Sequence, residues 1–420
     1  MTTRTTLLRL LLLLAMCTAA AFAGGGGSVY TRHGIGDLRY GTSGRGTGMG
    51  GVGIALLSSG VVDPLNPATW GVDNRTQFSI SGFYEGFASS DDRNSTYLSQ
   101  ASFNGLMFAI PLIPRWGVVL GAGITPYSRV DYNIVSPSSQ NGYDYTVRYQ
   151  GDGGLSQGHL GFSAMPDSQL LLGAKMNYYF GTIRNTLDQS FTPAQYTDAE
   201  DIRLTRFNGL GATFGIVYRG LKNILNLPAG QTLNIGAVVS TVSRMNSAEE
   251  RYFTYTTSSL TTRDTVLNPE GTTRLPLAAG GGIAFTAERY SLGADFTYQN
   301  WNAYTVNDVK SPDVRDSYRF SAGGELIPKR EASAPFFQRL AYRAGFFYDA
   351  SYYDIKGEPI NEIGFTAGIG VPIVSDTRLH FTTGYSFRGT TDQQLQKDRI
   401  LRFTVTLTAG ELWFVRPPEE

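Results

Sequence analysis

The segment 401–409 alternates apolar and polar side chains without interruption. Leu401, Phe403, Val405 and Leu407 would lie on one face of an extended strand, because successive side chains in a strand point to opposite sides. The arginine and the threonines between them would lie on the other face. One face suits hydrocarbon and the other suits water. The rhythm recurs over most of the chain in segments of roughly ten residues, which is typical of a transmembrane β-barrel.

The N-terminus predicts export. Arg4 and Arg9 accompany an apolar run at residues 7–14, and Ala21-Phe22-Ala23 offers a cleavage site between small residues. We therefore expect a signal peptide at residues 1–23. The run is too short to span a bilayer, and no later stretch supplies about 18 consecutive apolar residues. The exported chain is expected to have no transmembrane helix.

An alternative at this end is lipidation of Cys17, because Leu14-Ala15-Met16-Cys17 resembles a lipobox. Met16, however, stands where a small residue is expected. Cleavage after Ala23 would remove the only cysteine of the chain, and the exported protein would then form no disulfide.

The chain has 35 basic and 35 acidic residues. This balance argues against nucleic acid as a partner.

Fourteen strands are predicted from the alternation. They lie near residues 76–87, 98–110, 115–133, 143–164, 168–183, 201–219, 231–245, 274–287, 289–299, 314–326, 338–353, 359–373, 377–389 and 397–410. Every second connection is expected to be a polar outer loop, among them 134–142, 184–200, 246–273 and 300–313. Most of the others are tight turns. Long outer loops alternating with short turns are typical of bacterial barrels.

The predicted fold class is therefore all-β: an antiparallel transmembrane barrel of 14 strands, formed by residues 76–420. An even number lets an antiparallel sheet close without exposed edges. The alternative is a secreted, soluble all-β protein with one buried face. It would not need an apolar outward face on nearly every strand.

Residues 24–75 do not follow the alternation. Residues 44–57 are rich in glycine, and Asn66-Pro67-Ala68 follows. A large barrel has a lumen that leaks unless something fills it, so we expect this segment to fold inside the barrel as a plug. Gly46, Gly48 and Gly51 formally match a dinucleotide fingerprint. That motif needs a strand before it and a helix after it in a βαβ unit, which an exported barrel does not provide.

The plug motifs resemble a known family. Arg45, residues 49–55 beginning Met49-Gly50-Gly51, and Asn66-Pro67-Ala68 look like the N-terminal hatch of the FadL/TodX family of outer-membrane channels for hydrophobic compounds. Residues 342–346 and 413–414 resemble members from the Bacteroidetes. The resemblance implies a barrel with a hatch, located in the outer membrane. It also implies passive uptake of hydrophobic or amphipathic compounds such as long-chain fatty acids. The matching motifs do not identify the substrate of this chain.

Charged residues are predicted on the lumen face of the wall. The register places Lys175, Asp295, Arg319, Glu325, Arg343, Asp349, Glu362 and Arg402 there. A guanidinium or ammonium group could hold the carboxylate of an amphipathic ligand, and Arg319, Arg343, Arg402 and Lys175 are the candidates. The alternative is that these charges pair with each other and with the plug through Arg39, Arg45 or Asp63.

The third strand contains Gly121, Gly123 and Pro126. Proline cannot donate a ladder hydrogen bond and glycine weakens a strand, so together they predict a bulge or a local opening. The simpler alternative is a harmless bend at the membrane rim. In the resembled family a kinked third strand is tied to lateral exit of the ligand through the wall.

Catalytic patterns are scarce. The three histidines are scattered, and no metalloprotease, nucleophile-elbow or phosphate-loop motif occurs. His380 and Ser386 could be the catalytic pair of a barrel hydrolase, but no motif around them supports that function. We expect no enzyme activity, cofactor or metal.

The predicted function is that of an outer-membrane channel. Its expected partners are membrane lipid, a hydrophobic ligand and the barrel-assembly machinery that inserts it. The rival prediction is a subunit of a larger outer-membrane secretion or assembly complex that transports nothing itself.

Overall fold

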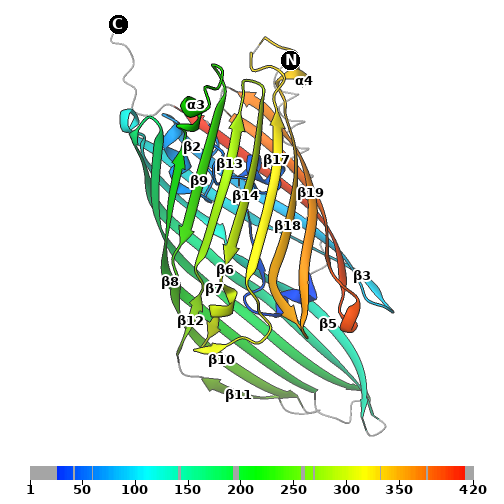
Figure 1. Cartoon of the computed structure of the whole chain (residues 1–420). Helices are drawn as coiled ribbons and strands as arrows, with labels where there is room; N and C mark the ends of the chain where they lie inside the picture. Colours follow the sequence, from blue (N-terminus) through cyan, green and yellow to red (C-terminus); the bar gives the residue numbers. More distant parts are fainter. Residues whose placement is uncertain are drawn as a thin grey trace, which may run out of the picture.

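The wall of the molecule is a closed sheet, and the N-terminal segment lies inside it (Figure 1). The computed structural model describes residues 26–40, 43–58, 60–140, 143–192, 198–256, 261–267, 270–331, 333–374 and 377–411. The predicted signal peptide, the cysteine within it and residues 413–420 lie outside these ranges. Among the described residues, no helix combines the length and hydrophobicity needed to cross a membrane.

Fourteen antiparallel strands make the wall, and three of them are interrupted. In order they are β2 (Thr76–Ser90), β3 (Ser95–Ile113), β4 (Val118–Pro126) with β5 (Ser128–Gln140), β6 (Tyr143–Asp167), β7 (Leu170–Thr192), β8 (Asp198–Tyr218), β9 (Thr232–Ser240) with β10 (Ser243–Thr256), β11 (Thr261–Leu267) with β12 (Gly271–Leu275) and β13 (Ala278–Thr286), β14 (Tyr290–Gln299), β17 (Ser317–Leu326), β18 (Ala341–Ile355), β19 (Glu358–Val374), β20 (Thr377–Gly389) and β21 (Lys397–Glu411). The first and last strands close the barrel by pairing from Thr76↔Glu411 to Ser90↔Lys397. The prediction of a 14-stranded antiparallel barrel is confirmed.

The two faces of the wall differ as the alternation predicts. On β14, Leu292 and Phe296 are about half exposed on the outer face, with relative exposures of 52% and 53%. The intervening Ser291 and Asp295 are buried in the lumen. On β21, Thr404 likewise faces inward and is buried. An apolar outer face with a polar inner face is the arrangement of a barrel that lies in lipid.

The two ends of the barrel are unequal. The short helices α3 (Leu221–Ile224) and α4 (Phe336–Arg339) lie at one end, here called the turn end. At the opposite end, called the loop end, strands β5 to β8, β10 and β11 extend well beyond their neighbours (Figure 1). A small hairpin, β15 (Thr305–Val306) and β16 (Val309–Lys310), pairs with β12 there.

This extension corrects the predicted outer loops. Segments 134–142, 184–200 and 246–273 were expected as loops, but β5, β7, β8, β10, β11 and β12 occupy most of them. The cause is that backbone pairing continues after the apolar outward face ends. Beyond lipid both faces of a strand can be polar, so the alternation disappears while the ladder of hydrogen bonds does not. Segment 300–313 holds a 3-10 turn, η5 (Trp301–Ala303), and the β15–β16 hairpin.

The third wall strand is divided at Tyr127, directly after Pro126. β4 pairs with β3 only from Leu106↔Ile124 to Ile113↔Val118. The part of β3 nearer the loop end, residues 95–105, pairs with β2 alone. β5 pairs with β6 on one side and, on its other side, with β1 (Asp37–Leu38) of the N-terminal segment. A seam therefore separates β3 from β5 in the wall.

The N-terminal segment, residues 26–75, lies inside the wall and is here called the hatch. Its elements are η2 (Val29–Arg32), β1, the five-residue helix α2 (Gly44–Gly48) and η3 (Pro67–Val72). Gly27 and Arg39 donate backbone hydrogen bonds to Asp131 and Tyr127 at the edge of β5. The hatch thus covers the β5 side of the seam from within.

Candidate functional site

The hatch packs on the wall through glycines that leave no room for a side chain. A Cβ atom placed on Gly345 of β18 would overlap the backbone of Met49 and Gly50. A Cβ on Gly173 of β7 would likewise overlap the backbone of Pro67 and Ala68, whereas one on Gly215 of β8 would overlap the side chain of Asn66. Backbone contact of this kind requires glycine. It fixes the hatch along the wall rather than leaving a gap around it.

A buried ion triad ties α2 to the wall. Glu325 of β17 accepts hydrogen bonds from Arg45 Nε at 3.0 Å and from Arg343 Nε at 2.7 Å. Arg45 also donates to Leu57 O and to Ser291 Oγ, and Arg343 Nη1 lies 2.8 Å from His380 Nδ1. Guanidinium groups buried this deeply need such partners, because an unpaired buried charge is strongly unfavourable.

Backbone groups of the hatch are held by wall side chains. Asp295 Oδ2 accepts from Gly53 N at 2.6 Å and from Ile54 N at 2.9 Å. Thr366 Oγ1 accepts from Gly50 N at 2.9 Å and donates to Gly48 O at 3.1 Å. Irregular backbone inside a barrel must find partners for its polar groups, and the inward side chains of the wall supply them.

A second set of ion pairs forms a chain around the loop side of the lumen. Arg39 makes a two-pronged contact with Glu85, with N–O distances of 2.7 and 2.8 Å. Glu85 also pairs with Arg402 at 2.7 Å, and Arg402 pairs with Glu362 at 2.5 Å. Beyond Glu362 the chain continues through Arg388 to Asp37 at 2.9 Å and to Asp398 at 3.1 Å. Forked guanidinium–carboxylate contacts fix both partners.

All four cations that were candidates for a ligand have protein partners in the structure. Arg343 and Arg402 belong to the two networks above. Arg319 pairs with Asp349 at 3.2 Å and donates to Gly50 O at 3.3 Å. Lys175 Nζ donates to Pro64 O of the hatch at 2.6 Å. Their lumen positions agree with the register, and their contacts are those of the alternative in which lumen charges pair with each other and with the hatch. A ligand role for them stays a prediction.

The hatch motif residues occupy structural positions. Asn66 caps η3, accepting from Ala68 N at 3.0 Å and donating through Nδ2 to Ile54 O at 2.7 Å. Pro67 stands at the start of η3, where a backbone N–H would have no hydrogen-bond partner within the helix. Met49 is fully buried, and Gly50 and Gly51 have positive φ angles of 78° and 101°. These residues shape the hatch backbone that the wall glycines accommodate.

Asp63 forms hydrogen bonds within the hatch. Its carboxylate accepts from Ser43 Oγ and, at 2.9 Å, from Leu65 N. Burial raises the pKa of Asp63, while the Ser43 hydroxyl, the Leu65 amide and nearby Lys175 act in the opposite direction. A carboxyl group in this setting braces the loop from Ser43 to Leu65.

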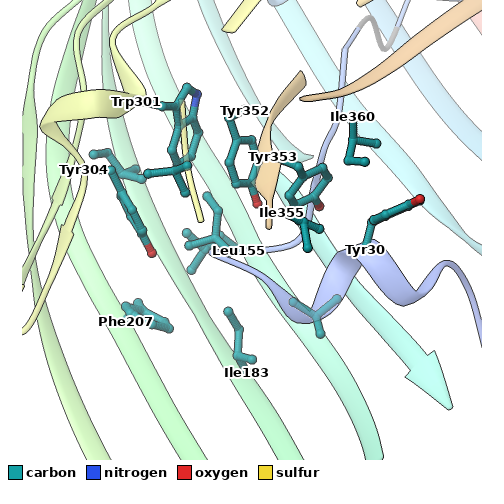
Figure 2. Close-up of a cluster of buried hydrophobic side chains, with 14 of the residues drawn as sticks. Tyr30, Leu155, Ile183, Phe207, Trp301, Tyr304, Tyr352, Tyr353, Ile355 and Ile360 are labelled. Carbon is teal, nitrogen blue, oxygen red and sulfur yellow. The ribbon is translucent and has the colours of Figure 1, made fainter. Parts of the chain in front are cut away.

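An aromatic cluster closes the lumen at the loop end (Figure 2). Trp301 and Tyr352 stack with ring centroids 4.1 Å apart and are essentially inaccessible to solvent. The cluster draws on the hatch, on the wall strands and on η5. Its buried members are Tyr30, Ile35, Val130, Tyr132, Leu155, Tyr179, Ile183, Phe207, Met245, Leu275, Trp301, Tyr304, Val314, Tyr352, Tyr353, Ile355, Ile360 and Leu395. Such packing excludes water from between these side chains.

Two adjoining cavities in the lumen share Leu38, Arg39, Tyr40 and Arg319 in their linings. One, of about 130 Å³, is lined by charged groups that already have partners, including Arg39, Glu85 and Arg402. The other, of about 190 Å³, lies beside Pro126 and Lys175. Pockets that enclose organic ligands usually measure about 300–1,000 Å³. Each of the two volumes, taken alone, lies below this range.

The three residues of the predicted third-strand kink have separate surroundings. Pro126 ends β4 at the seam. A Cβ on Gly121 would overlap the ring of Trp70 in the hatch, and one on Gly123 would overlap Met107. The two glycines therefore make room for neighbouring side chains, whereas the break itself falls at Pro126 and Tyr127. Lateral exit through this seam stays a prediction.

The possible hydrolase pair is not assembled. His380 contacts Arg343 and, at 3.2 Å, Thr408. Ser386 instead accepts a hydrogen bond from Arg402 at 2.8 Å. The described part of the chain also holds no group of three or more side chains suited to bind a metal ion.

Several members of the ion-pair chain were not anticipated, namely Glu85, Asp37, Arg388 and Asp398. The strand register would have placed Glu85 and Arg388 inward, and the closure of first strand on last would have set Glu85 opposite Arg402. For Asp37 the sequence offers no signal, because the hatch has no periodic pattern.

The family follows from a comparison with protein-family models. The model for BamG matches residues 1–417. The chain belongs to the BamG family. A comparison with curated proteins found no match. The expected resemblance to FadL/TodX proteins is confirmed for the fold, while the family itself is BamG.

Solved structures share the fold at low sequence identity. The Ralstonia pickettii toluene transporter TbuX is 14% identical, with a TM-score of 0.56 over 91% of this chain and 100% of its own. The Pseudomonas putida toluene transporter TodX is 14% identical, with a TM-score of 0.56 over 90% and 100%. A Pseudomonas aeruginosa FadL homologue is 14% identical, with a TM-score of 0.60 over 90% and 100%. At this identity the likeness establishes the FadL-like fold of this BamG-family chain and nothing about its cargo.

Proposed function

We propose that this BamG-family protein is a subunit of the barrel-assembly machinery of a bacterial outer membrane and acts as a rigid structural barrel, not as a conduit. The family name follows the naming of the subunits of that machinery. This was the rival prediction from sequence, and the family match favours it over a channel for hydrophobic compounds.

The observation that carries the proposal is the filled lumen. The aromatic cluster covers the loop end, the hatch is pinned by backbone contact with wall glycines, and the two cavities measure about 130 and 190 Å³. Opening a path would separate buried ion pairs such as Arg45–Glu325, and buried charges without partners are strongly unfavourable. A scaffold has no need of such a path.

Membrane placement is part of the proposal. The apolar outer face suits lipid, and the turn end would face the periplasm because short turns do so in bacterial barrels. An epitope inserted at residues 257–260, between β10 and β11, should be stained on intact cells. An epitope between Asp167 and Leu170 should be stained only after the membrane is opened. The reverse pattern would invert the orientation.

Co-purification tests the assembly role. The chain, tagged at residues 257–260, would be extracted in mild detergent from cells that express it at its natural level. We expect the central barrel-inserting subunit of the assembly machinery to co-purify in a fixed ratio. An outer-membrane porin carrying the same tag serves as the control. Recovery of the chain alone, with the machinery purified intact without it, would refute the proposal.

The seam between β3 and β5 favours a second candidate, a channel with lateral exit. Residues 95–105 of β3 lack a partner strand on that side. Cells carrying the chain would be tested for uptake of a long-chain fatty acid and of toluene, against cells without it. Uptake that depends on the chain and falls in Pro126→Thr would support the channel. Equal uptake with and without the chain would exclude it.

A further inference from the structure

Two arginines with the same charge face each other on the outer surface of the wall. Arg244 of β10 and Arg274 of β12 are register partners, and both are exposed. Directly opposed residues in an antiparallel pair have Cβ atoms about 4.5–5.5 Å apart, and like charges at that spacing are destabilising. A bound anion would offset the repulsion between the two guanidinium groups.

Protein groups do not supply that anion. Within the described residues, neither Arg244 nor Arg274 has an ion pair or a side-chain hydrogen bond. Neighbouring arginines on the same extension are matched instead: Arg251 pairs with Asp201 at 2.6 Å, and Arg206 pairs with Glu250. The contrast sets these two arginines apart from the general charge of the surface.

The surface around the pair is hollowed on both sides. An open hollow of about 710 Å³ is lined by both arginines together with Tyr178, Asn208, Leu210, Val242 and Asn246. A second hollow of about 300 Å³ is lined by both arginines with Thr272, Thr305 and Asp308. Asp308 contributes one negative charge but makes no ion pair with either arginine among the described residues. Two amides and two guanidinium groups thus offer donors around one space.

The pair lies at the boundary between apolar and charged surface. Tyr178, Leu210, Arg244 and Arg274 form one row across four strands, each the register partner of the next. Toward the turn end the outer face of β8 continues with the exposed Phe214 and Ile216. Toward the loop end it continues with charged groups such as Arg206. A molecule bound here meets hydrocarbon on one side and water on the other.

We propose that Arg244 and Arg274 together bind a phosphate group on the headgroup of a lipid in the outer leaflet. Guanidinium groups match phosphate with forked hydrogen bonds, and the two asparagine amides can donate to remaining headgroup oxygens. The acyl chains lie against Leu210 and Phe214. The proposal rests on the membrane placement above but not on the assembly role, and the two can fail separately.

The test uses the double variant Arg244→Gln/Arg274→Gln in the full chain. Its matched control is Arg115→Gln/Arg289→Gln, which removes two exposed arginines at the turn end. Native mass spectrometry of the protein in detergent would follow titration with a diphosphorylated glycolipid of the lipid A type. Parallel titrations would use its dephosphorylated form and inorganic phosphate. Heat-modifiable mobility on gels shows that each variant is folded.

The wild type and the control should bind the diphosphorylated lipid equally. The double variant should bind it about tenfold or more weakly, since one charge-assisted hydrogen bond accounts for roughly that factor. Arg244→Lys/Arg274→Lys should retain part of the affinity, because charge remains while the fork is lost. Equal binding by the double variant, or equal binding of the dephosphorylated lipid, would overturn the proposal. Inorganic phosphate that displaces the lipid at equal concentration would assign the site to a free anion instead.

Discussion

Replacement of Glu325 by glutamine is expected to loosen the contact between the hatch and the wall. The side chains of Arg45, Glu325 and Arg343 are 8%, 5% and 2% exposed. Removing the charge of one partner from a buried pair costs about 3–5 kcal/mol, because the other charge stays buried without compensation. Here two guanidinium groups lose their carboxylate. The amide oxygen can still accept one hydrogen bond, so we expect a loss of about 3 kcal/mol.

Unfolding by urea in detergent micelles would measure this loss through the midpoint, with the folded barrel followed by its heat-modifiable gel mobility. The matched control is Glu288→Gln in the exposed turn between β13 and β14, which should change stability by about 0.5 kcal/mol or less. Replacing the whole triad by apolar residues, in Arg45→Met/Glu325→Leu/Arg343→Met, should recover much of the loss. A decrease below about 1 kcal/mol in Glu325→Gln would refute the reasoning that the triad is a buried charge network.

Three further outcomes are expected. Gly345→Val should expose the hatch to protease while the barrel still forms, because a side chain there overlaps the hatch backbone. Gly158→Ala should not, because a Cβ there would make only ordinary van der Waals contacts at 3.9 Å. Val405→Arg should cost about 2–4 kcal/mol on the lipid face and Val405→Thr much less, as measured by urea midpoints. Burial lowers the pKa of His33 below its usual 6.5. The unfolded chain therefore binds more protons than the folded one, and the free energy of unfolding falls as the pH drops below about 6.5. His33→Gln should reduce this dependence of stability on pH, and an unchanged dependence would contradict the prediction.

The alternation in the sequence was sufficient for the wall. Leu292 and Phe296 face outward, and Asp295 faces the lumen, as a period of two requires. The alternation of apolar and polar residues did not predict strand length, because β10 continues to Thr256 after its outward face has ceased to be apolar. Apolar residues report contact with lipid and not the end of a hydrogen-bonded ladder.

Breaks in the strands were harder to predict. Pro126 marks the division between β4 and β5, and Pro276 marks the division after Leu275 in the same way. The division after Ser240 carries no comparable signal. The fold of the hatch could not be derived, because its contacts depend on wall glycines distant in the sequence, such as Gly345 beneath Met49.

The contact between Glu85 and Arg402 has a consequence for how the barrel closes. These residues face each other where the first wall strand meets the last. A slip of two residues at that junction would keep every apolar side chain in lipid, so hydrophobicity alone cannot reject it. It would, however, move Glu85 away from Arg402 and leave buried charges unmatched. The pair therefore favours the correct register at closure, and Arg39 of the hatch adds a third member to the same buried network.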